Sequence, residues 1–331
     1  MDTTFVLTKG ILWSNIVCMD APEMIKALLQ NIGVAVKGKP EAVKLAVAAL
    51  ISRGHLLIED VPGIGKTTLA YSIARSINCS FQRVQFTSDL LPSDITGVTV
   101  FNRTTQEFEF KEGPIFANIV LADEINRTTP KTQSALLEAM NEGQVTVEKD
   151  THQLPKPFMV IATQNPLEYH GTFPLPESQM DRFVMRIRLG YPDISDEKEI
   201  LKTYTTDYIK DGLKPVLDAQ DVLRLQDEAS RVRVDEALMD YILRIAQATR
   251  ETAALALGVS PRGTLFLQKA ARATALISGR DYCIPDDIKR LAVPVLAHRV
   301  VVNARGGGFG KRGEDAEGII SDIVNSVEVP V

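Results

Sequence analysis

The sequence predicts an α/β fold in which a parallel five-stranded sheet is followed by a smaller helical domain. Through the first 190 residues, short apolar runs of strand length alternate with segments of helical spacing. After that point nearly all segments have helical spacing. The chain has 331 residues, 45% of them hydrophobic, which is enough for two domains. We expect an extension over 1–20, a core over 21–190 and a helical domain over 191–331.

Five runs are predicted to be the strands of the sheet: HLLIE (55–59), RVQF (83–86), IVLA (119–122), MVIAT (159–163) and FVMRIRL (183–189). All but the last are nearly continuous in apolar character, which is typical of parallel strands buried on both faces. Between the first two runs, Leu69, Ile73 and Ile77 share one helical stripe. The pattern therefore predicts a central sheet covered by helices.

Two segments depart from this alternation. Residues 97–116 and 142–158 alternate apolar and polar side chains around clusters of turn-forming residues. We expect each to form a β-hairpin inserted among the helices, near 97–112 and 142–157.

The part of the chain after Tyr191 is predicted to form a small helical bundle. Leu238, Ile242 and Ile245 recur at steps of three and four residues, as in a helix with one buried face. Helices are expected over 195–208, 221–228, 235–250, 261–278 and 285–297. The Gly-rich stretch 305–314 lacks periodicity and is expected to be a flexible loop, with a phosphate or polynucleotide contact as the alternative.

Composition argues against several classes of protein. A net charge of -5 does not favour a protein that binds nucleic acid or an anionic membrane through its overall charge. No apolar run approaches the roughly 20 residues of a membrane span. Three separated cysteines without a CxxC pair and four scattered histidines lack the spacing of disulfide scaffolds or zinc sites. We expect a soluble cytoplasmic protein.

The stretch EDVPGIGKTTLA has the residues of a phosphate-binding loop between a strand and a helix. Gly63 and Gly65 let the backbone turn with its N–H groups facing inward, and the following helix adds its positive end. Lys66 can reach the β and γ phosphates, and the Thr67 hydroxyl can ligate Mg²⁺. Asp60 stands where the pattern GxxxxGK[ST] has glycine, and because aspartate tolerates left-handed backbone geometry better than most residues, we expect the loop to close. A Gly-rich turn without a ligand is the alternative.

Polar residues follow two further strands. In NIVLADEINR, Asp123 and Glu124 come at the carboxyl end of a strand, where parallel sheets bind ligands. Asp123 would hold Mg²⁺ and Glu124 would orient and deprotonate a water molecule, unless both lie in a solvated loop. Asn165 follows MVIAT and could contact the γ phosphate or the water, or cap the loop before Pro166.

Two arginines are candidates for neutralising charge on a transferred phosphoryl group. Arg262 lies in the first turn of an expected helix, with Ser260 suited to the N-cap and Pro261 to the first position. An arginine there opposes the helix dipole unless an anion lies nearby. Arg182, in PESQMDRF before the last strand, is the second candidate.

Seven stretches together resemble the MoxR family of AAA+ ATPases, in order from about Leu28 to the C-terminus. They are EDVPGIGKTTLA, FTSDLLPSDITGV, FEFKEGPIFANIVLADEINR, SALLEAMNEGQVTV, VIATQNPLEYHGTFPLPESQMDRF, SPRGTLFLQKAARA and HRV. The resemblance implies a P-loop AAA+ αβα core with an all-helical lid domain. It also implies a homo-oligomeric ring, hexameric, with ATP and Mg²⁺ bound between subunits.

The resemblance assigns roles to individual residues. Lys66 and Thr67 match Walker A, Asp123 and Glu124 match Walker B, Asn165 matches sensor 1 and Arg262 matches sensor 2 on the lid. Arg182 matches the arginine finger that acts on a neighbour's nucleotide, and Arg127 is the alternative. Val36 and Gly38 match the segment that packs on adenine, and the phosphate loop comprises Asp60, Val61, Pro62, Gly63, Ile64, Gly65, Lys66, Thr67 and Thr68. The two hairpins match inserts that face the pore or a partner.

The implied function is Mg-dependent ATP hydrolysis that drives a chaperone or remodelling activity, in complex maturation or metal insertion. The implied partner is a protein with a von Willebrand factor A domain. The alternatives are an AAA+ nucleic-acid motor, a magnesium-chelatase-like motor subunit and a nucleotide switch without turnover. No residue identifies the client.

Overall fold

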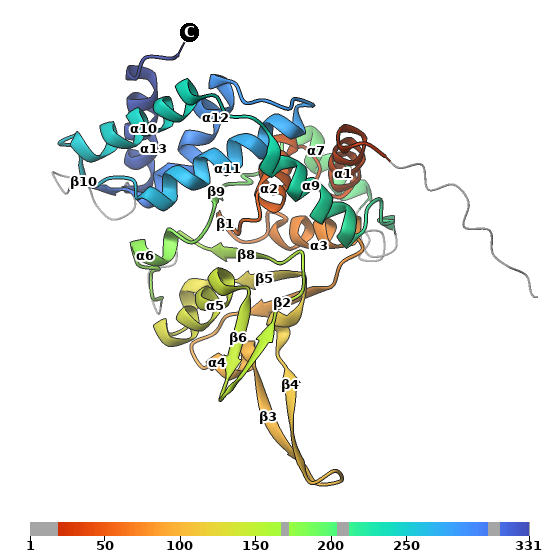
Figure 1. The fold of residues 1–331 in the computed structure, drawn as a ribbon. Coiled ribbons are helices and arrows are strands. Elements are labelled where there is room, and N and C mark those ends of the chain that lie inside the picture. The colour runs from red at the N-terminus through yellow and green to blue at the C-terminus, as the bar shows by residue number, and fades with distance from the viewer. Residues whose placement is uncertain (1–18, 167–171, 204–211, 304–311, 331) are drawn as a thin grey trace, which may run out of the picture.

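A five-stranded parallel sheet lies at the centre of the computed structural model, which describes residues 19–166, 172–203, 212–303 and 312–330. The strand order is β2-β5-β8-β1-β9, and every neighbouring pair is parallel (Figure 1). The strands are β1 (Leu56–Glu59), β2 (Phe81–Gln85), β5 (Ile119–Asp123), β8 (Met159–Gln164) and β9 (Met185–Ile187). The predicted parallel sheet is therefore confirmed.

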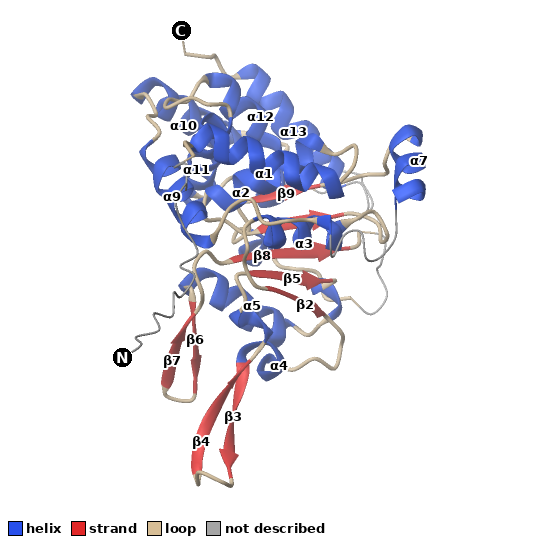
Figure 2. Ribbon diagram, turned by 90° about the vertical axis from the view of Figure 1, so that its right-hand side faces the viewer, coloured by secondary structure: helices blue, strands red, loops and turns tan. Residues whose placement is uncertain are grey.

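Helices cover both faces of this sheet (Figure 2). On one face lie α1 (Ala21–Ala35), α2 (Pro40–Ile51) and α3 (Lys66–Ser76), and on the other α4 (Pro92–Thr96) and α5 (Pro130–Glu142). Successive side chains of a strand point to opposite faces, so Leu56 and Ile58 join one buried cluster and Leu57 joins the other. This double burial explains the apolar runs of the central strands.

The edge strand β2 does not follow the prediction of burial on both faces. Gln82, Arg83 and Gln85 are exposed, and only Val84 of this strand is buried. The run RVQF was expected to lie inside the sheet like the other runs, but β2 has a neighbour on one side only. An edge position tolerates these polar side chains, and it places two of them beside the carboxyl end of β5.

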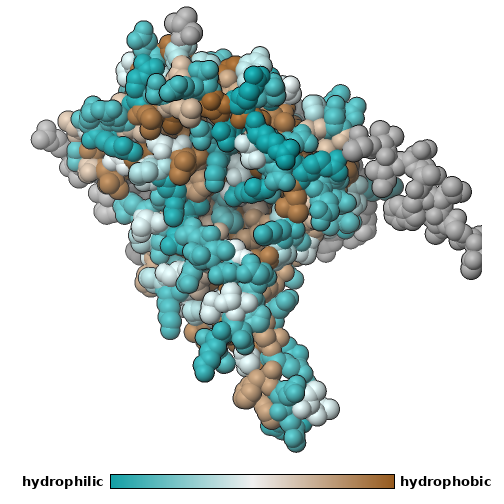
Figure 3. Space-filling model, viewed as in Figure 1, coloured by the Kyte–Doolittle hydropathy of each residue, from teal (hydrophilic) through white to brown (hydrophobic). Residues whose placement is uncertain are grey.

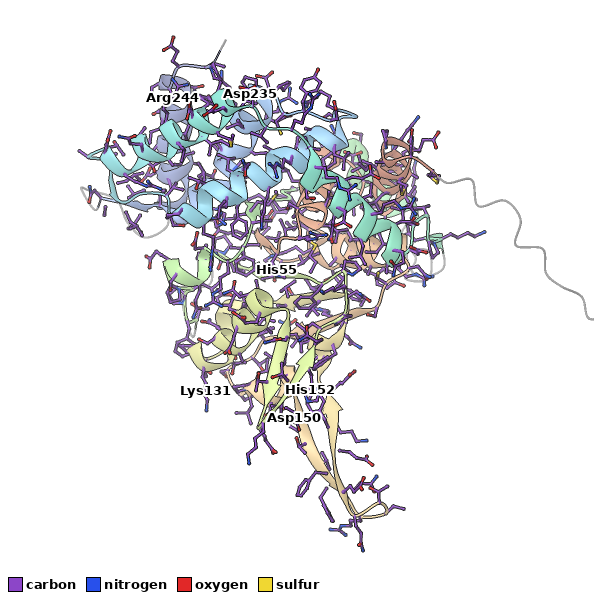
Figure 4. All side chains as sticks on the ribbon, in the orientation of Figure 1. His55, Lys131, Asp150, His152, Asp235 and Arg244 are labelled. Atoms are coloured by element: carbon purple, nitrogen blue, oxygen red, sulfur yellow. The ribbon has the colours of Figure 1, made fainter. Side chains whose placement is uncertain are left out.

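Both predicted hairpins are present, and they contact each other. They are β3 (Gly97–Asn102) with β4 (Glu107–Glu112), and β6 (Gln144–Val147) with β7 (Asp150–Gln153). Both project on the side of the sheet that carries α4 and α5 (Figures 1 and 2). The His152 ring, labelled in Figure 4, stacks on Phe110 with ring centroids 4.0 Å apart.

The lid is helical with a short β-ribbon in addition. Its helices are α7 (Ile194–Thr203), α9 (Ala219–Arg231), α10 (Glu236–Glu251), α11 (Pro261–Ile277), α12 (Pro285–Leu296) and α13 (Arg312–Ser326). The ribbon pairs β10 (Leu255–Leu257) with β11 (Val301–Val302), and both the ribbon and α13 were absent from the prediction. The described helices include none that could cross a membrane.

The lid and the core share one hydrophobic cluster, because α11 packs on α2 and residues from both parts belong to it. Short helical turns complete the described chain: α6 (Glu177–Met180), η1 (Pro114–Phe116), η2 (Ile125–Arg127) and η3 (Ala297–Arg299). Most of the predicted extension over 1–20 and of the Gly-rich stretch 305–314 lies outside the described residues.

Ile161 in the central strand β8 tests how much the sheet depends on its packing. Its side chain has no exposed surface. We expect Ile161→Ala to lower the free energy of unfolding by about 2–5 kcal/mol, because it removes buried methyl groups and leaves a cavity. The matched control Ile161→Val should cost about 0.5–1.5 kcal/mol. Urea denaturation followed by circular dichroism would measure both, and equal effects would contradict this account.

His55 lies at the start of β1, between the sheet and α5 (Figure 4). Its Nδ1 atom accepts a hydrogen bond from the Val160 amide at 2.9 Å, so Nε2 carries the proton and donates to the Met140 carbonyl at 3.0 Å. Burial lowers the pKa of this imidazole from 6.5 to about 4, and the hydrogen bond to Met140 opposes the shift. The folded protein therefore holds His55 neutral.

The unfolded chain can protonate His55 below pH 6.5, whereas the folded chain resists protonation down to about pH 4. Its contribution to stability is thus complete above 6.5 and is lost as the pH falls through this window. We expect His55→Asn to reduce the pH slope of the unfolding free energy by about 1.4 kcal/mol per pH unit there. Denaturation curves from pH 8 to pH 4 would measure the slopes. The unfolding free energies at pH 8 give the cost of the substitution when His55 is neutral in both states. Identical slopes would show that the folded protein protonates His55 as readily as the unfolded chain does.

Candidate functional site

A cavity of about 720 Å³ lies at the carboxyl ends of the strands, where open parallel sheets bind ligands. It is lined by Val34, Ala35, Val36, Lys37, Lys39, Pro62, Gly63, Ile64, Gly65, Lys66, Thr67, Thr68, Arg83, Gln85, Asp123, Glu124, Asn165, Pro192, Ile200, Leu201, Gly212 and Leu213. The cavity thus brings together the predicted phosphate loop, the acidic pair and Asn165. Val36, predicted to pack on adenine, also lines the cavity, whereas Arg83, Gln85 and the lining residues from Pro192 to Leu213 come from segments that were not predicted to contribute.

The phosphate loop runs from the end of β1 to the start of α3. Gly63 and Gly65 have φ angles of 85° and 94°, in the left-handed region that favours glycine. Gly65 is the N-cap and supplies no side-chain hydrogen bond, so the first N–H groups of α3 can receive an anion. Lys66 begins the helix, and its Nζ donates to the Asp60 carbonyl at 2.5 Å, across the loop. The loop can therefore surround a phosphate group with N–H donors and one cation.

Asp60 begins the loop without left-handed backbone geometry. Its carboxylate accepts hydrogen bonds from the backbone amides of Val61 at 2.9 Å, Leu189 at 2.8 Å and Gly190 at 2.7 Å. Asp60 and Val61 are not part of the described cavity lining, so Asp60 instead ties the start of the loop to the end of β9.

Asp123 lies at the end of β5 with both carboxylate oxygens hydrogen-bonded. Oδ1 accepts from the Thr163 hydroxyl at 2.6 Å. Oδ2 accepts from Arg83, at 2.7 Å from Nη2 and 3.1 Å from Nε. Thr67 lines the same cavity, so its hydroxyl and the Asp123 carboxylate together offer the oxygen ligands that Mg²⁺ prefers.

Glu124 is held by two side chains and by its own backbone. Its Oε2 atom accepts from Gln85 at 2.7 Å and from Arg127 at 2.8 Å. The φ angle of 59° is unusual for a residue other than glycine, and such strain is common at functional positions. The backbone amide donates to the Thr163 hydroxyl at 2.9 Å, so one threonine orients both members of the acidic pair.

Gln85 connects the two acidic residues. Its side-chain oxygen Oε1 accepts a hydrogen bond from Arg83 at 3.0 Å, and its side-chain nitrogen Nε2 donates one to Glu124. Neither Arg83 nor Gln85 was predicted to contribute to the site, because RVQF has the length and position of an apolar strand. The signal was present, since the two polar residues alternate in RVQF and precede its end.

The other end of the cavity is apolar and suits a nucleobase. Val36 is buried there, with Ile64 and Leu213 also in the lining. Gly38, predicted to contact adenine, is outside the described lining and has a φ angle of 69°. A Cβ at this position would come within 2.0 Å of the Asp196 carboxylate, so Gly38 allows α7 to approach.

The helix α7 is held over this end of the cavity by polar contacts. Lys37 lies 3.5 Å from Glu199, and Lys39 Nζ donates to the Tyr191 carbonyl at 2.5 Å. Leu201 of α7 lines the cavity although it is 80% exposed. This helix was predicted as part of the lid, without a contact to the nucleotide.

Asn165 lines the cavity as predicted, but neither Arg182 nor Arg262 belongs to the described lining. Arg182 precedes the amino end of β9, so on the order of 20 Å of extended chain separates it from Leu189 at the cavity side. Its Nη1 atom donates to the Leu137 carbonyl at 2.5 Å. Arg262 is exposed in the first turn of α11. The predicted residues are therefore divided between the two ends of the strands. Asn165 lies with the cavity at the carboxyl ends, whereas Arg182 and Arg262 lie on the side of the amino end of β9.

Comparison with known families identifies one segment of the chain as an ATPase core and another as a lid. The family described as "ATPase family associated with various cellular activities (AAA)" matches residues 55–185, and the AAA lid domain matches residues 247–323. The first match contains the phosphate loop and the acidic pair. The second contains Arg262.

Three individual proteins are similar over most of the chain. The uncharacterized protein YeaC of Bacillus subtilis is 49% identical, over 94% of this chain and 97% of that protein. Chaperone MoxR1 of Mycobacterium tuberculosis is 43% identical, over 80% and 72%. A crystal structure of a candidate ATPase from Cytophaga hutchinsonii has a TM-score of 0.86 and 37% identity, and covers 94% of this chain and 96% of that one.

The role of Asp60 can be tested by removing its carboxylate. We expect Asp60→Ala to lower the free energy of unfolding by about 1–3 kcal/mol, because the amides of Leu189 and Gly190 lose their acceptor. Asp218→Ala is the control, since it removes a helix cap that accepts one backbone hydrogen bond and should cost about 1 kcal/mol. Urea denaturation compares them, and an Asp60→Ala protein as stable as the parent would contradict the role.

Proposed function

Because the chain belongs to the MoxR family of AAA+ ATPases, and is therefore an ATPase, we propose that it hydrolyses Mg-ATP in a site completed by a neighbouring copy. The observation that carries the proposal is the separation of the predicted residues. Lys66, Asp123 and Glu124 line the cavity at the carboxyl ends of the strands, whereas Arg182 and Arg262 lie on the side of the amino end of β9.

The cavity supplies the binding groups for ATP. The N–H groups at Gly63 and Gly65 and the start of α3 would receive the phosphates, with Lys66 at the β and γ positions. The apolar end near Val36 and Ile64 would hold the base. Mg²⁺ fits the oxygen donors of Thr67 and Asp123, and when bound it would neutralise charge on the phosphate oxygens.

Glu124 is the proposed general base, since its carboxylate lines the cavity beside Asp123. It would take a proton from the attacking water, and the Asn165 amide would hold that water or the γ phosphate. The Gln85 and Arg127 contacts fix the carboxylate, so a water must approach the oxygen that they leave accessible. The Thr163 contacts keep Asp123 and Glu124 at a constant separation.

Arg182 is the proposed arginine finger. It is too far from its own phosphate loop to act there, and an arginine supplied to a transition state contributes about 10³–10⁵ in rate. Arg127 suits the role less well, because its guanidinium is paired with Glu124 of the same chain. Arg262 lies at the same edge as Arg182, and this placement supports its action on the neighbour's nucleotide too.

A head-to-tail contact between the cavity and the arginine edge generates a ring when the rotation closes. We propose a hexamer from the family resemblance. The family also suggests a partner with a von Willebrand factor A domain, a location in the cytoplasm, and work in complex maturation or metal insertion. The relative named Chaperone MoxR1 supports a chaperone activity.

The hairpin β3–β4 supports a protein client over a nucleic acid. Phe101 and Phe108 form an edge-to-face pair near its tip and are 49% and 73% exposed, and Figure 3 shows apolar colouring on this projection. The same hairpin carries three glutamates against Arg103 and Lys111, and Lys111 lies 3.5 Å from Glu109. Exposed aromatic side chains suit an apolar peptide segment, and the hairpin has no excess of positive charge that would attract a phosphate backbone.

The shared site predicts that hydrolysis depends on assembly. We expect the rate per subunit to rise with protein concentration, and Glu124→Gln to lower it by about 10²–10⁴-fold. Glu142→Gln, at the exposed end of α5, is the matched control and should hydrolyse like the parent. Steady-state phosphate release measures the rate, and sedimentation measures assembly. A constant rate per subunit while assembly changes would show that one chain completes its own site.

A further inference from the structure

Arg299 is the most heavily buried arginine among the described residues, with 3% of its surface exposed. It lies in η3, directly after α12, which packs against β9. Its Nε donates to the Asp181 carboxylate at 3.0 Å, and its two terminal nitrogens donate to the carbonyls of Phe183 and Val295. Burial lowers the pKa of this guanidinium to about 10, and Asp181 opposes the shift, so it stays charged.

A buried charge with so many directed contacts fixes its surroundings. Arg299 bonds to the chain on both sides of Arg182, at Asp181 and at Phe183. Replacing one partner of such a pair leaves an uncompensated charge, which makes the geometry costly to change. The segment that carries Arg182 is therefore held from the lid side, and its Nη1 contact with Leu137 holds it from the α5 side.

The helix α11 is joined to the same junction. The Ser260 hydroxyl caps α11 by accepting from the Gly263 amide at 3.2 Å, and it donates to Asp181 at 3.1 Å. The Phe266 ring lies 5.1 Å from the Arg299 guanidinium carbon. A Cβ at Gly263 would come within 3.0 Å of Arg299, so the first turn of α11 packs directly on this side chain.

We propose that Arg299 is a positioning residue that, through Asp181 and Ser260, holds Arg182 and Arg262 in one rigid unit. This inference rests on the proposed shared site. Both arginines then approach a neighbour's phosphates together, and a movement of the lid that shifts α11 also shifts Arg182. Arg299 itself contacts neither nucleotide nor water in this scheme.

The test uses Arg299→Lys, which keeps the charge but loses the planar fork that joins Asp181 to the backbone carbonyls. We expect hydrolysis per subunit to fall about 10- to 100-fold, since a displacement of about 1 Å can cost that much. Binding of a fluorescent ADP analogue to the variant's own phosphate loop should be unchanged. The control Arg280→Lys breaks another two-bonded pair in the lid, with Asp287, and should hydrolyse like the parent.

Mixing with Glu124→Gln separates positioning from damage. A Glu124→Gln subunit lacks the base but carries intact arginines, so it can complete the site of an Arg299→Lys neighbour. We expect a one-to-one mixture to recover about a quarter of the parent rate, because about half the sites have a base and half of those face an intact donor. Arg182→Ala mixed in the same way is the reference.

Recovery with both Arg182→Ala and Arg299→Lys is the expected result. If only the mixture that contains Arg182→Ala recovers activity, the role of Arg299 is overturned and the shared site is retained. The same holds if the Arg299→Lys protein hydrolyses ATP at the parent rate. No recovery with Arg182→Ala would overturn the shared site itself, and the Arg299 proposal with it.

If Arg299→Lys does not fold, Ser260→Ala tests the same junction, because it removes the hydroxyl that joins α11 to Asp181. We expect a loss of about 2- to 10-fold that the same mixture recovers. An unchanged rate, or a loss without recovery, would overturn the proposal.

Discussion

The parallel pairing of β5, β8 and β1 is the constraint on which the site depends. Parallel strands all end at the same edge, so Asp123, Asn165 and the loop after Glu59 meet there although about 100 residues separate them along the chain. This pairing requires helices on both faces, because each central strand is apolar on both sides. The packing that stabilises the core thus also assembles the phosphate site.

Because the strands are parallel, their amino ends also lie together, on the side of the sheet opposite the cavity. At the amino end of β9, the buried Arg299 and the half-buried Asp181 and Ser260 form a junction between the core and the lid. Their neighbours Arg182 and Arg262 lie outside the described lining of the chain's own cavity. A subunit with a phosphate site at one edge and arginines at the other is suited to head-to-tail assembly, in which each copy contributes to the next.

Each acidic side chain of the cavity is paired with an arginine. Arg83 compensates Asp123 and Arg127 compensates Glu124, while Gln85 joins the two pairs through its amide group. A metal ion at Asp123 would compete with the Arg83 contact, and any shift of Arg83 reaches Glu124 through Gln85. The acidic pair is therefore one hydrogen-bonded unit, in which the proposed metal ligand and the proposed base are not independent.

The sequence by itself determined the features that depend on neighbouring residues. Strand runs, hairpins, the turn at Gly63 and Gly65 and the N-cap at Ser260 follow from local backbone preferences and periodicity, and the structure contains all of them. Tertiary structure alone decided which distant groups meet. Asp60 accepts from the end of β9, Arg83 reaches Asp123 because β2 is an edge strand, and α7 lies over the cavity because Gly38 lets it approach. These contacts depend on strand order and packing, and no local pattern encodes them.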